Sequence, residues 1–314
     1  MGAVAAQPGP LFRSRDGVLG HRRQALRRPV HALLGGKVRD ELRAYANGWY
    51  DSLETPEEWA AGALDVIDRG YDAMKFDPFE NAVRDISNEG LALALERVAA
   101  IREAIGPEPD LLIEGHARLT PAEAIKVGRR LEEFNPMWYE APVQAHQGPA
   151  AFREVREALS IPIADDLASI THKFDAFAFL AERAIDVIQP DTGNAGGLRE
   201  VQYIAQMADA AGVCTAPHAA AGPISLAGCI HVDAVVPNFR IQEGFEASTR
   251  PDWVDDVIET AVEVEDGRIV VPDGPGLGVE FDADAAREHD CNPMPDHNFL
   301  EPEFKDTYQA HERG

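Results

Sequence analysis

The sequence predicts an α/β protein built on a barrel of eight parallel strands. Apolar strand-like runs and helical segments alternate from about residue 45 onwards, a pattern typical of parallel sheets. Six acid/base residues also recur at gaps of 26, 26, 25, 27 and 25 residues, and such a gap fits one strand with its crossover helix. The chain has 314 residues, which is enough for a barrel of about 250 residues with extensions.

Each strand is an apolar run, and helical patterns lie between the runs. The strands are expected at residues 42–50, 73–78, 111–116, 138–143, 161–166, 186–191, 214–218 and 234–244. Helices are expected over 54–70, 88–106 and 119–134, with further helical segments between the later strands. Thr120 is the expected N-cap of the third helix, because Pro121 suits a first helical position. After the barrel, an Asp-Gly turn predicts a hairpin within 262–282.

Polar residues end six of the strand runs. They are Glu114, Glu140, Asp166, Asp191, His218 and Glu243. In barrels of this kind the active site is built at the carboxyl ends of the strands. We therefore expect these six side chains to converge on one mouth.

Three of these residues suit a metal ion. Glu114, Glu140 and Asp166 end neighbouring strands, and carboxylate oxygens are the ligands that Mg²⁺ prefers. A trio of carboxylates without a cation would repel strongly. Asp165 competes for the third position, although the 26-residue spacing favours Asp166.

Two histidines and a lysine are further candidates for the chemistry of the site. Asp191 and His218 end adjacent strands, so a carboxylate–imidazole pair can form a base that works near neutral pH. His116 lies two residues after Glu114, which places both on one side of an extended chain and makes His116 a candidate acid. Lys75 lies in an apolar strand, where an unpaired ammonium is costly, so it is expected to face the mouth and neutralise an anionic substrate.

Composition narrows the functional class. The formal charge is −25, from 54 acidic and 29 basic residues, which disfavours nucleic acid as a partner and suggests adaptation to a salt-rich cytoplasm. No apolar run approaches the roughly 20 residues of a membrane span. The three cysteines form no CxxC pair, and no export signal follows the early arginine pairs, so a reducing cytoplasm is expected.

Several motifs together resemble the enolase superfamily, and within it the acid-sugar dehydratases of the mandelate racemase/muconate lactonizing enzyme family, the galactonate dehydratase-like proteins. The motifs are MKFDPF at 74–79, IEGHARL at 113–119, WYEAPV at 138–143, IDVIQPDTGNAGG at 185–197, TAPHAAAGPISLAGCIHVDA at 215–234 and IQEG at 241–244. The resemblance implies a (β/α)7β barrel of the TIM type. It also implies a small-molecule sugar acid as partner, and the family's habit of forming oligomers makes a second copy of the chain a candidate partner.

The resemblance also implies a reaction. It is the Mg²⁺-dependent dehydration of an aldonate to a 2-keto-3-deoxy acid through an enediolate intermediate. Three residues, Glu114, Glu140 and Asp166, correspond to the Mg²⁺ ligands. His218, oriented by Asp191, corresponds to the base that removes the α-proton.

Two further roles come from the same resemblance. His116 corresponds to the acid that protonates the departing 3-hydroxyl, and Glu243 to the acid that hydrogen-bonds the substrate carboxylate. Racemases of the group carry a second lysine where this chain has Asp77, which favours dehydration over racemisation or epimerisation.

The front of the chain departs from the family, whose members begin with an α+β capping domain. LLGG, which ends that region, begins here at residue 33, so the capping domain is expected to be largely missing. We expect residues 1–44 to be a partly disordered remnant of the cap, 45–260 the catalytic barrel, and 261–314 a hairpin and tail packed on the barrel exterior. A catalytically impaired remnant of such an enzyme is therefore the alternative to an active dehydratase.

Overall fold

The structure is a computed structural model that describes residues 27–79, 82–166, 172–219, 222–245, 256–258, 262 and 264–288. The strands are β1 Glu41–Asn47, β2 Ala73–Phe76, β3 Asp110–Glu114, β4 Trp138–Glu140, β5 Ile163–Asp165, β6 Val187–Ile188, β7 Cys214–Thr215, β8 Gln242–Phe245 and β9 Arg268–Val270. The α-helices are α2 Val30–Leu34, α3 Pro56–Asp68, α4 Asn88–Ile105, α5 Pro121–Leu131, α6 Pro149–Ala158, α7 Lys173–Ala181, α8 Leu198–Ala211, α9 Pro223–Asp233 and α10 Ala283–Glu288.

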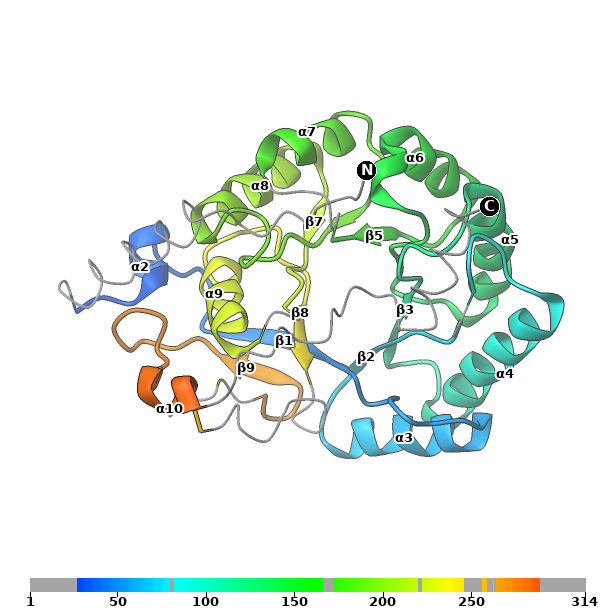
Figure 1. Cartoon of the computed structure of the whole chain (residues 1–314), viewed down its shortest axis with the longest axis horizontal. Coiled ribbons are helices and arrows are strands. Elements are labelled where there is room, and N and C mark those ends of the chain that lie inside the picture. The colour runs from blue at the N-terminus through cyan, green and yellow to red at the C-terminus, as the bar shows by residue number, and fades with distance from the viewer. Residues whose placement is uncertain are drawn as a thin grey trace.

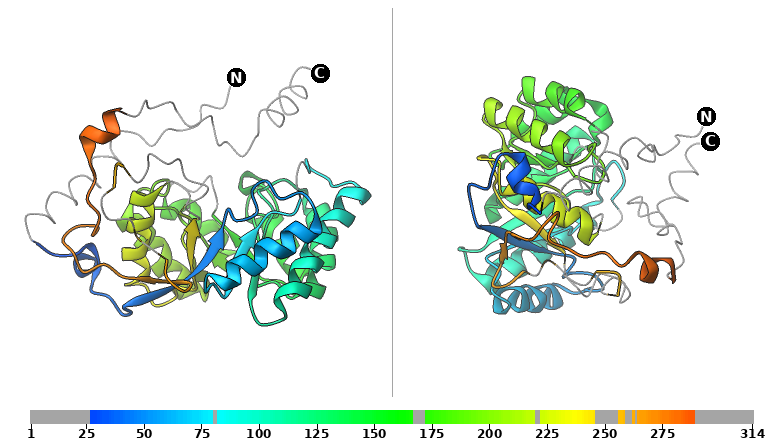
Figure 2. Two further views of the ribbon diagram at one scale, coloured as in Figure 1. Left: turned by 90° about the horizontal axis from the view of Figure 1, so that it is seen from below. Right: turned by 90° about the vertical axis from the view of Figure 1, so that its left-hand side faces the viewer.

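The strands form the barrel that the alternation predicted. Neighbouring strands pair in parallel in the order β7-β6-β5-β4-β3-β2-β1-β8, so chain order and spatial order agree from β1 to β7. The ring closes where Thr215 of β7 bridges in parallel to Phe239, just before β8. Figure 1 shows the helices arranged around these strands, and Figure 2 shows them on the outside of the strand layer.

Local signals explain where the helices begin. The Thr55 side chain accepts from the backbone N–H of Glu58, and the Glu58 side chain in turn accepts from the Thr55 N–H, which is a complete capping box for α3. Thr120 accepts from the Glu123 N–H, and Pro121 is the first residue of α5, as predicted. These contacts satisfy backbone N–H groups that have no partner within the helix.

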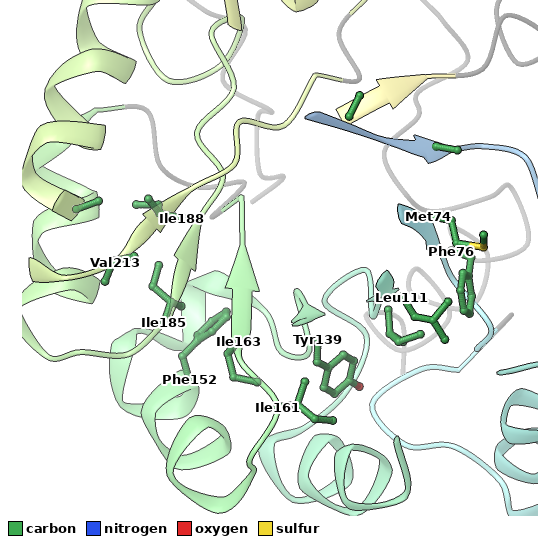
Figure 3. Packing of buried hydrophobic residues seen from close by; sticks show 14 of the residues in the cluster. Met74, Phe76, Leu111, Tyr139, Phe152, Ile161, Ile163, Ile185, Ile188 and Val213 are labelled. Atoms are coloured by element: carbon green, nitrogen blue, oxygen red, sulfur yellow. The ribbon is translucent and has the colours of Figure 1, made fainter. Parts of the chain in front are cut away.

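Two apolar layers hold the barrel together. The larger one lies between the strands and the helices, and Figure 3 shows part of it, including Leu111, Tyr139 and Ile163 from successive strands and Phe152 of α6. The smaller layer fills the barrel interior with side chains from the opposite face of the same strands. The strands therefore carry apolar side chains on both faces, as expected for a parallel sheet covered on both sides.

The predicted Asp-Gly hairpin is confirmed. Glu265 and Arg268 exchange two backbone hydrogen bonds, and Asp266 and Gly267 both have positive φ, 48° and 66°, as a type I′ turn requires. After this turn β9 runs antiparallel to the start of β1, with Arg43 opposite Arg268. The hairpin therefore extends the sheet at the amino-terminal end of the barrel (Figure 2).

The prediction for strand eight was wrong at its beginning. The apolar residues at 234–236 form the turn that follows α9, in which the Val235 and Val236 N–H groups both donate to the Val232 carbonyl. Pro237 has no N–H to continue the helix, and β8 begins only at Gln242. An apolar run of three residues does not distinguish a helix end from a strand.

Some expectations fall on residues that the structure does not describe. These are nearly all of the first 28 residues and the tail after α10. The division into cap remnant, barrel and exterior tail stays a prediction, although β1 begins at Glu41, before the expected boundary at residue 45. Within the described ranges, no helix is long and apolar enough to cross a membrane.

Candidate active site

A ring of polar side chains follows from the two-residue period of the strands. One residue from or beside each strand forms the inner apolar layer: Tyr45, Ala73, Leu112, Trp138, Ala164, Val187, Ala216 and Ile241. Two residues further along, the same face carries Asn47, Lys75, Glu114, Glu140, Asp166, Gln189, His218 and Glu243. We call these eight residues the polar ring. It contains six of the predicted site residues, while Asp191 and His116 lie just beyond it.

Lys75 is ion-paired with three carboxylates of the polar ring. Its Nζ lies 2.7 Å from Glu140 Oε1, 3.0 Å from Glu243 Oε1 and 3.4 Å from Glu114 Oε2. Burial lowers the pKa of Lys75, but the charges of Glu140 and Glu243 outweigh it and hold this pKa well above its usual value. Lys75 is therefore a cation at any physiological pH.

Glu114 and Glu140 lie in register on β3 and β4, so their side chains share one face and repel each other. Burial and the charge of Glu114 raise the pKa of Glu140. Burial also raises the pKa of Glu114, but His116 and Lys75 outweigh it and lower that pKa. The Trp138 indole donates to Glu140 Oε2 over 2.8 Å and holds this carboxylate in place.

The third carboxylate of the set is identified by strand alternation. Ala164 is part of the inner layer and pairs with Glu140, so Asp166 shares their face while Asp165 points to the other. Burial raises the pKa of Asp166, and His218 and Glu114 both act on it, so its carboxylate lies within their electrostatic reach. Asp166 therefore fits the predicted ligand position better than Asp165.

The donor set fits a divalent cation in its chemistry. Glu114, Glu140 and Asp166 offer carboxylate oxygens from three successive strands. Burial and the charge of Glu114 raise the pKa of Glu140, and a bound cation would offset the repulsion between the two carboxylates. Among the described side chains, no three groups of ligand type are close enough together to form a finished metal site. Lys75 contacts two of these carboxylates, so a bound cation would have to share them with its ammonium.

His218 and Asp191 form the predicted pair. His218 Nδ1 lies 2.9 Å from Asp191 Oδ2, and the other oxygen, Oδ1, accepts from the Gly193 N–H and the Ser225 hydroxyl. The Asp191 carboxylate therefore fixes the imidazole and leaves Nε2 for another partner. Burial lowers the pKa of His218, but the charges of Glu243, Asp191 and Asp166 outweigh it and raise this pKa to about 10.

His116 reaches the site by a different route from the one predicted. β3 ends at Glu114, and His116 and Ala117 have positive φ, 46° and 57°, so the chain turns instead of staying extended. The turn is stabilised by the His116 N–H, which donates to Glu114 Oε1 over 2.7 Å. The prediction that His116 continues the extended strand and shares a side with Glu114 was therefore wrong. The chain turns after Glu114, and the Glu114 carboxylate stabilises that turn.

Asp77 pairs with the ring of His116. The Asp77 carboxylate contacts His116 Nδ1, and Arg118 Nη1 lies 2.5 Å from the same oxygen. Burial raises the pKa of Asp77, but His116 and Arg118 outweigh it and lower this pKa. The site thus contains a second carboxylate–imidazole pair.

Glu243 is saturated with donors. Its Oε1 accepts from the Asn47 amide at 2.8 Å and from Lys75, and its Oε2 accepts from the Ala219 N–H at 2.7 Å. Burial raises the pKa of Glu243, but Lys75 and His218 outweigh it and lower this pKa to about 2. In this arrangement Glu243 is an acceptor, whereas the role implied by the resemblance needs a donor to a substrate carboxylate.

Sequence reasoning missed three residues of the site. Asn47 and Gln189 occupy ring positions on β1 and after β6, and Asp77 holds His116. Counting two residues on from each buried strand residue would have found Asn47 and Gln189. No signal in the sequence alone pairs Asp77 with His116, because a turn after β3 brings them together.

Comparison with known proteins agrees with this architecture. A family model described as enolase C-terminal domain-like matches residues 58–285. A solved structure of a member of the enolase superfamily from Salmonella Typhimurium superposes with a TM-score of 0.83 at 30% identity, covering 88% of this chain and 76% of that one.

Two curated relatives are sugar-acid dehydratases by name. The chain is 36% identical over 276 residues to D-gluconate/D-galactonate dehydratase of Picrophilus torridus, covering 88% of this chain and 70% of that protein. It is 37% identical over 265 residues to D-gluconate dehydratase of Thermoproteus tenax, covering 84% of this chain but only 53% of that protein.

Proposed function

This chain belongs to the enolase superfamily, in the family of enolase C-terminal domain-like proteins, and we propose that it is a hydro-lyase that dehydrates sugar acids. The proposed substrate is an aldonate and the proposed product a 2-keto-3-deoxy acid. Both relatives described above are named for aldonate substrates, which supports the substrate class. The proposed metal is Mg²⁺, held by Glu114, Glu140 and Asp166.

One observation carries this proposal: the site contains two carboxylate–imidazole pairs on opposite sides of the ring. His116 follows β3 and His218 follows β7, four strands apart in a ring of eight. The carboxylate-rich part of the polar ring lies between them. A β-elimination needs a base at one carbon and an acid at the next, and this arrangement supplies both.

Glu114, Glu140 and Asp166 are the proposed metal ligands. A divalent cation bound there would hold the substrate carboxylate, offset the negative charge that develops as the C2 proton leaves, and lower the pKa of His218. Lys75 supports the same end of the substrate, because its ammonium carries a fixed positive charge within the ring. The contacts of Glu243 support a role in holding Lys75 toward that carboxylate.

His218 is the proposed base. Its Nδ1 pairs with Asp191, so Nε2 is the atom that takes the C2 proton, and the electron pair of the C–H bond moves into the carboxylate. The Asp191 carboxylate stabilises the imidazolium that forms through this hydrogen bond. The hydrogen bonds from Gly193 and Ser225 keep the Asp191 carboxylate from rotating away.

His116 is the proposed acid. As the C3–O bond breaks, the departing hydroxide takes a proton from His116 and leaves as water, and a C2–C3 double bond forms. The resulting enol then moves its hydroxyl proton to C3, which gives the 2-keto-3-deoxy acid. Asp77 keeps His116 oriented toward the leaving group.

The runner-up is a racemase or epimerase of the same superfamily. Such a reaction needs a second base on the face opposite His218, and Asp77 stands where racemases carry their second lysine. Asp77 accepts from Arg118 and His116, so it is not available as a free base. These contacts favour dehydration.

The test is a screen of C5 and C6 aldonates for 2-keto-3-deoxy acid formation with Mg²⁺, in molar KCl and with an EDTA control. We expect Mg²⁺-dependent product from at least one aldonate. Product that is insensitive to EDTA would contradict the metal, and folded protein without any product would contradict the proposed activity.

A further inference from the structure

Gln189 is a buried member of the polar ring whose amide is unpaired. The side chain is fully buried, yet within the described part of the chain neither Nε2 nor Oε1 has a hydrogen-bond partner. Buried amides are nearly always hydrogen-bonded, because a lost partner costs the full desolvation of the group. An amide left unpaired beside a candidate active site therefore points to a ligand.

The backbone holds Gln189 in this position. Its N–H donates to the Asp165 carbonyl over 3.0 Å, and its carbonyl accepts from the His218 N–H over 3.4 Å. Pro190 follows, which restricts the backbone further. The amide therefore cannot leave the ring by a local movement of the chain.

Gln189 lies between the proposed metal ligand Asp166 and the proposed base His218. β6 lies between β5 and β7, so Gln189 has Asp166 on one side and His218 on the other. In the proposed mechanism the substrate carboxylate, C1, lies at Glu114, Glu140 and Asp166, and C2 lies at His218. The hydroxyl on C2 is then the substrate group nearest to Gln189. An amide offers N–H donors and a carbonyl acceptor, and a hydroxyl can use both.

We propose that Gln189 is a substrate-binding residue whose amide pairs with the C2 hydroxyl of the sugar acid. This inference rests on the proposed function. The C2 oxygen stays on the substrate throughout, first as a hydroxyl, then as an enol and finally as the keto oxygen. An uncharged amide can bind all three forms without adding charge to the carboxylate-rich ring.

The test replaces Gln189 with methionine, which has a similar length and no hydrogen-bonding amide. For Gln189→Met we expect kcat/KM for the aldonate to fall about tenfold or more. A 2-deoxyaldonate, tested as a competitive inhibitor, should bind the wild type about tenfold more weakly than the aldonate does. The variant should bind the two compounds with nearly equal affinity. The Tm should stay equal or rise, because an apolar group of the same shape replaces an unpaired amide.

Gln202 provides the matched control. It is also a buried glutamine, but its Nε2 donates to the Leu34 carbonyl over 2.6 Å and its Oε1 accepts from Arg199 over 3.2 Å. It lies on α8, outside the ring. We expect Gln202→Met to lower the Tm and leave kcat/KM unchanged, the reverse of Gln189→Met.

Two outcomes would overturn the inference, and they are distinguishable. If the wild type dehydrates an aldonate and Gln189→Met keeps the same kcat/KM and the same discrimination against the 2-deoxy compound, the amide does not bind substrate, while the proposed function stands. If the wild type neither binds nor turns over any aldonate with Mg²⁺, the proposed function fails and this inference fails with it.

Discussion

At the residue scale, the buried charges of the polar ring depend on one another. Lys75 contacts Glu114, Glu140 and Glu243, and His218 lies within electrostatic reach of Glu243 and Asp166. Removing one member therefore changes the pKa of several others. The metal-free protein should show this coupling directly, because no bound cation then offsets the carboxylates.

His218 gives a pH-dependent contribution to stability with a definite sign. Its folded pKa of about 10 lies above the unfolded value, about 6.5, so its stabilising contribution is fully present below about pH 6.5 and is lost as the pH rises through 10. We expect the difference in unfolding free energy between wild type and His218→Asn, measured with denaturant in EDTA, to shrink between these limits. A difference that grows with pH would contradict the charge assignment.

Asp77 should affect the loss of the 3-hydroxyl but not the removal of the C2 proton. If it orients His116, Asp77→Asn should lower kcat for dehydration about 10- to 100-fold, the usual range for a supporting hydrogen-bond partner. His218 and Asp191 are unchanged in this variant, so exchange of the substrate C2 proton with solvent deuterium should continue. The measurement is proton NMR of the aldonate in D₂O.

Asp72 is the matched control for Asp77. Its carboxylate pairs with Arg43 over 2.8 Å, just before β2 begins, so it lies away from the polar ring. Asp72→Asn should leave both exchange and dehydration unchanged. Equal loss of exchange and dehydration in Asp77→Asn would show a general structural role and contradict its pairing with the acid.

At the element scale, the ends of β3 and β4 approach too closely for a side chain between them. A Cβ on Gly115 would lie 2.9 Å from the Ala141 carbonyl oxygen and 3.0 Å from that of Glu140. The Gly115 N–H also donates to the Glu140 carbonyl over 2.8 Å. This close contact fixes the distance between the strand ends that carry Glu114 and Glu140.

Gly115→Ala should therefore reduce both stability and metal affinity. We expect a loss of about 1–3 kcal/mol in unfolding free energy from overpacking, and weaker Mg²⁺ binding by calorimetry because the two carboxylates move apart. The control is Gly274→Ala, whose Cβ would meet only ordinary van der Waals contact at 3.6 Å. Unchanged Mg²⁺ binding in Gly115→Ala would mean that this contact does not position the ligands.

The strands and their order could be predicted from the sequence, whereas two local turns and one site residue could not. Parallel strands and their order followed from alternation, and the ring positions of Glu114, Glu140 and His218 followed from regular spacing. The left-handed turn at His116 and the turn at 234–236 after α9 did not, because both depend on contacts that form only in the fold. Asp77 was missed for the same reason, because the turn after β3 brings His116 to it. Gln189 was within reach of the two-residue strand period, but only the fold shows that its buried amide has no partner among the described residues.

At the scale of the whole molecule, the net negative charge is the property that most affects folding stability. The formal charge is −25, and the acidic residues are spread along the chain. Like charges on one folded surface repel, and salt screens that repulsion because the Debye length falls from about 10 Å at 0.1 M to about 3 Å at 1 M. We therefore expect salt to stabilise the folded protein.

This leads to a simple measurement of thermal stability. We expect the Tm to rise when the protein is moved from dilute buffer to molar KCl. A Tm that stays constant or falls would contradict adaptation to a salt-rich environment. The effect should also be larger at pH 7 than near the sequence pI of about 4.7, where the net charge vanishes.

We propose that His218 and His116 act as base and acid in the dehydration of an aldonate. The most direct measurement is NMR of the reaction in D₂O with Mg²⁺, comparing wild type with His218→Asn. We predict a 2-keto-3-deoxy acid that has lost the C2 proton and carries deuterium at C3, and neither product nor exchange with His218→Asn. Exchange at C2 without loss of water in the wild type would contradict these two roles and indicate a racemase or epimerase.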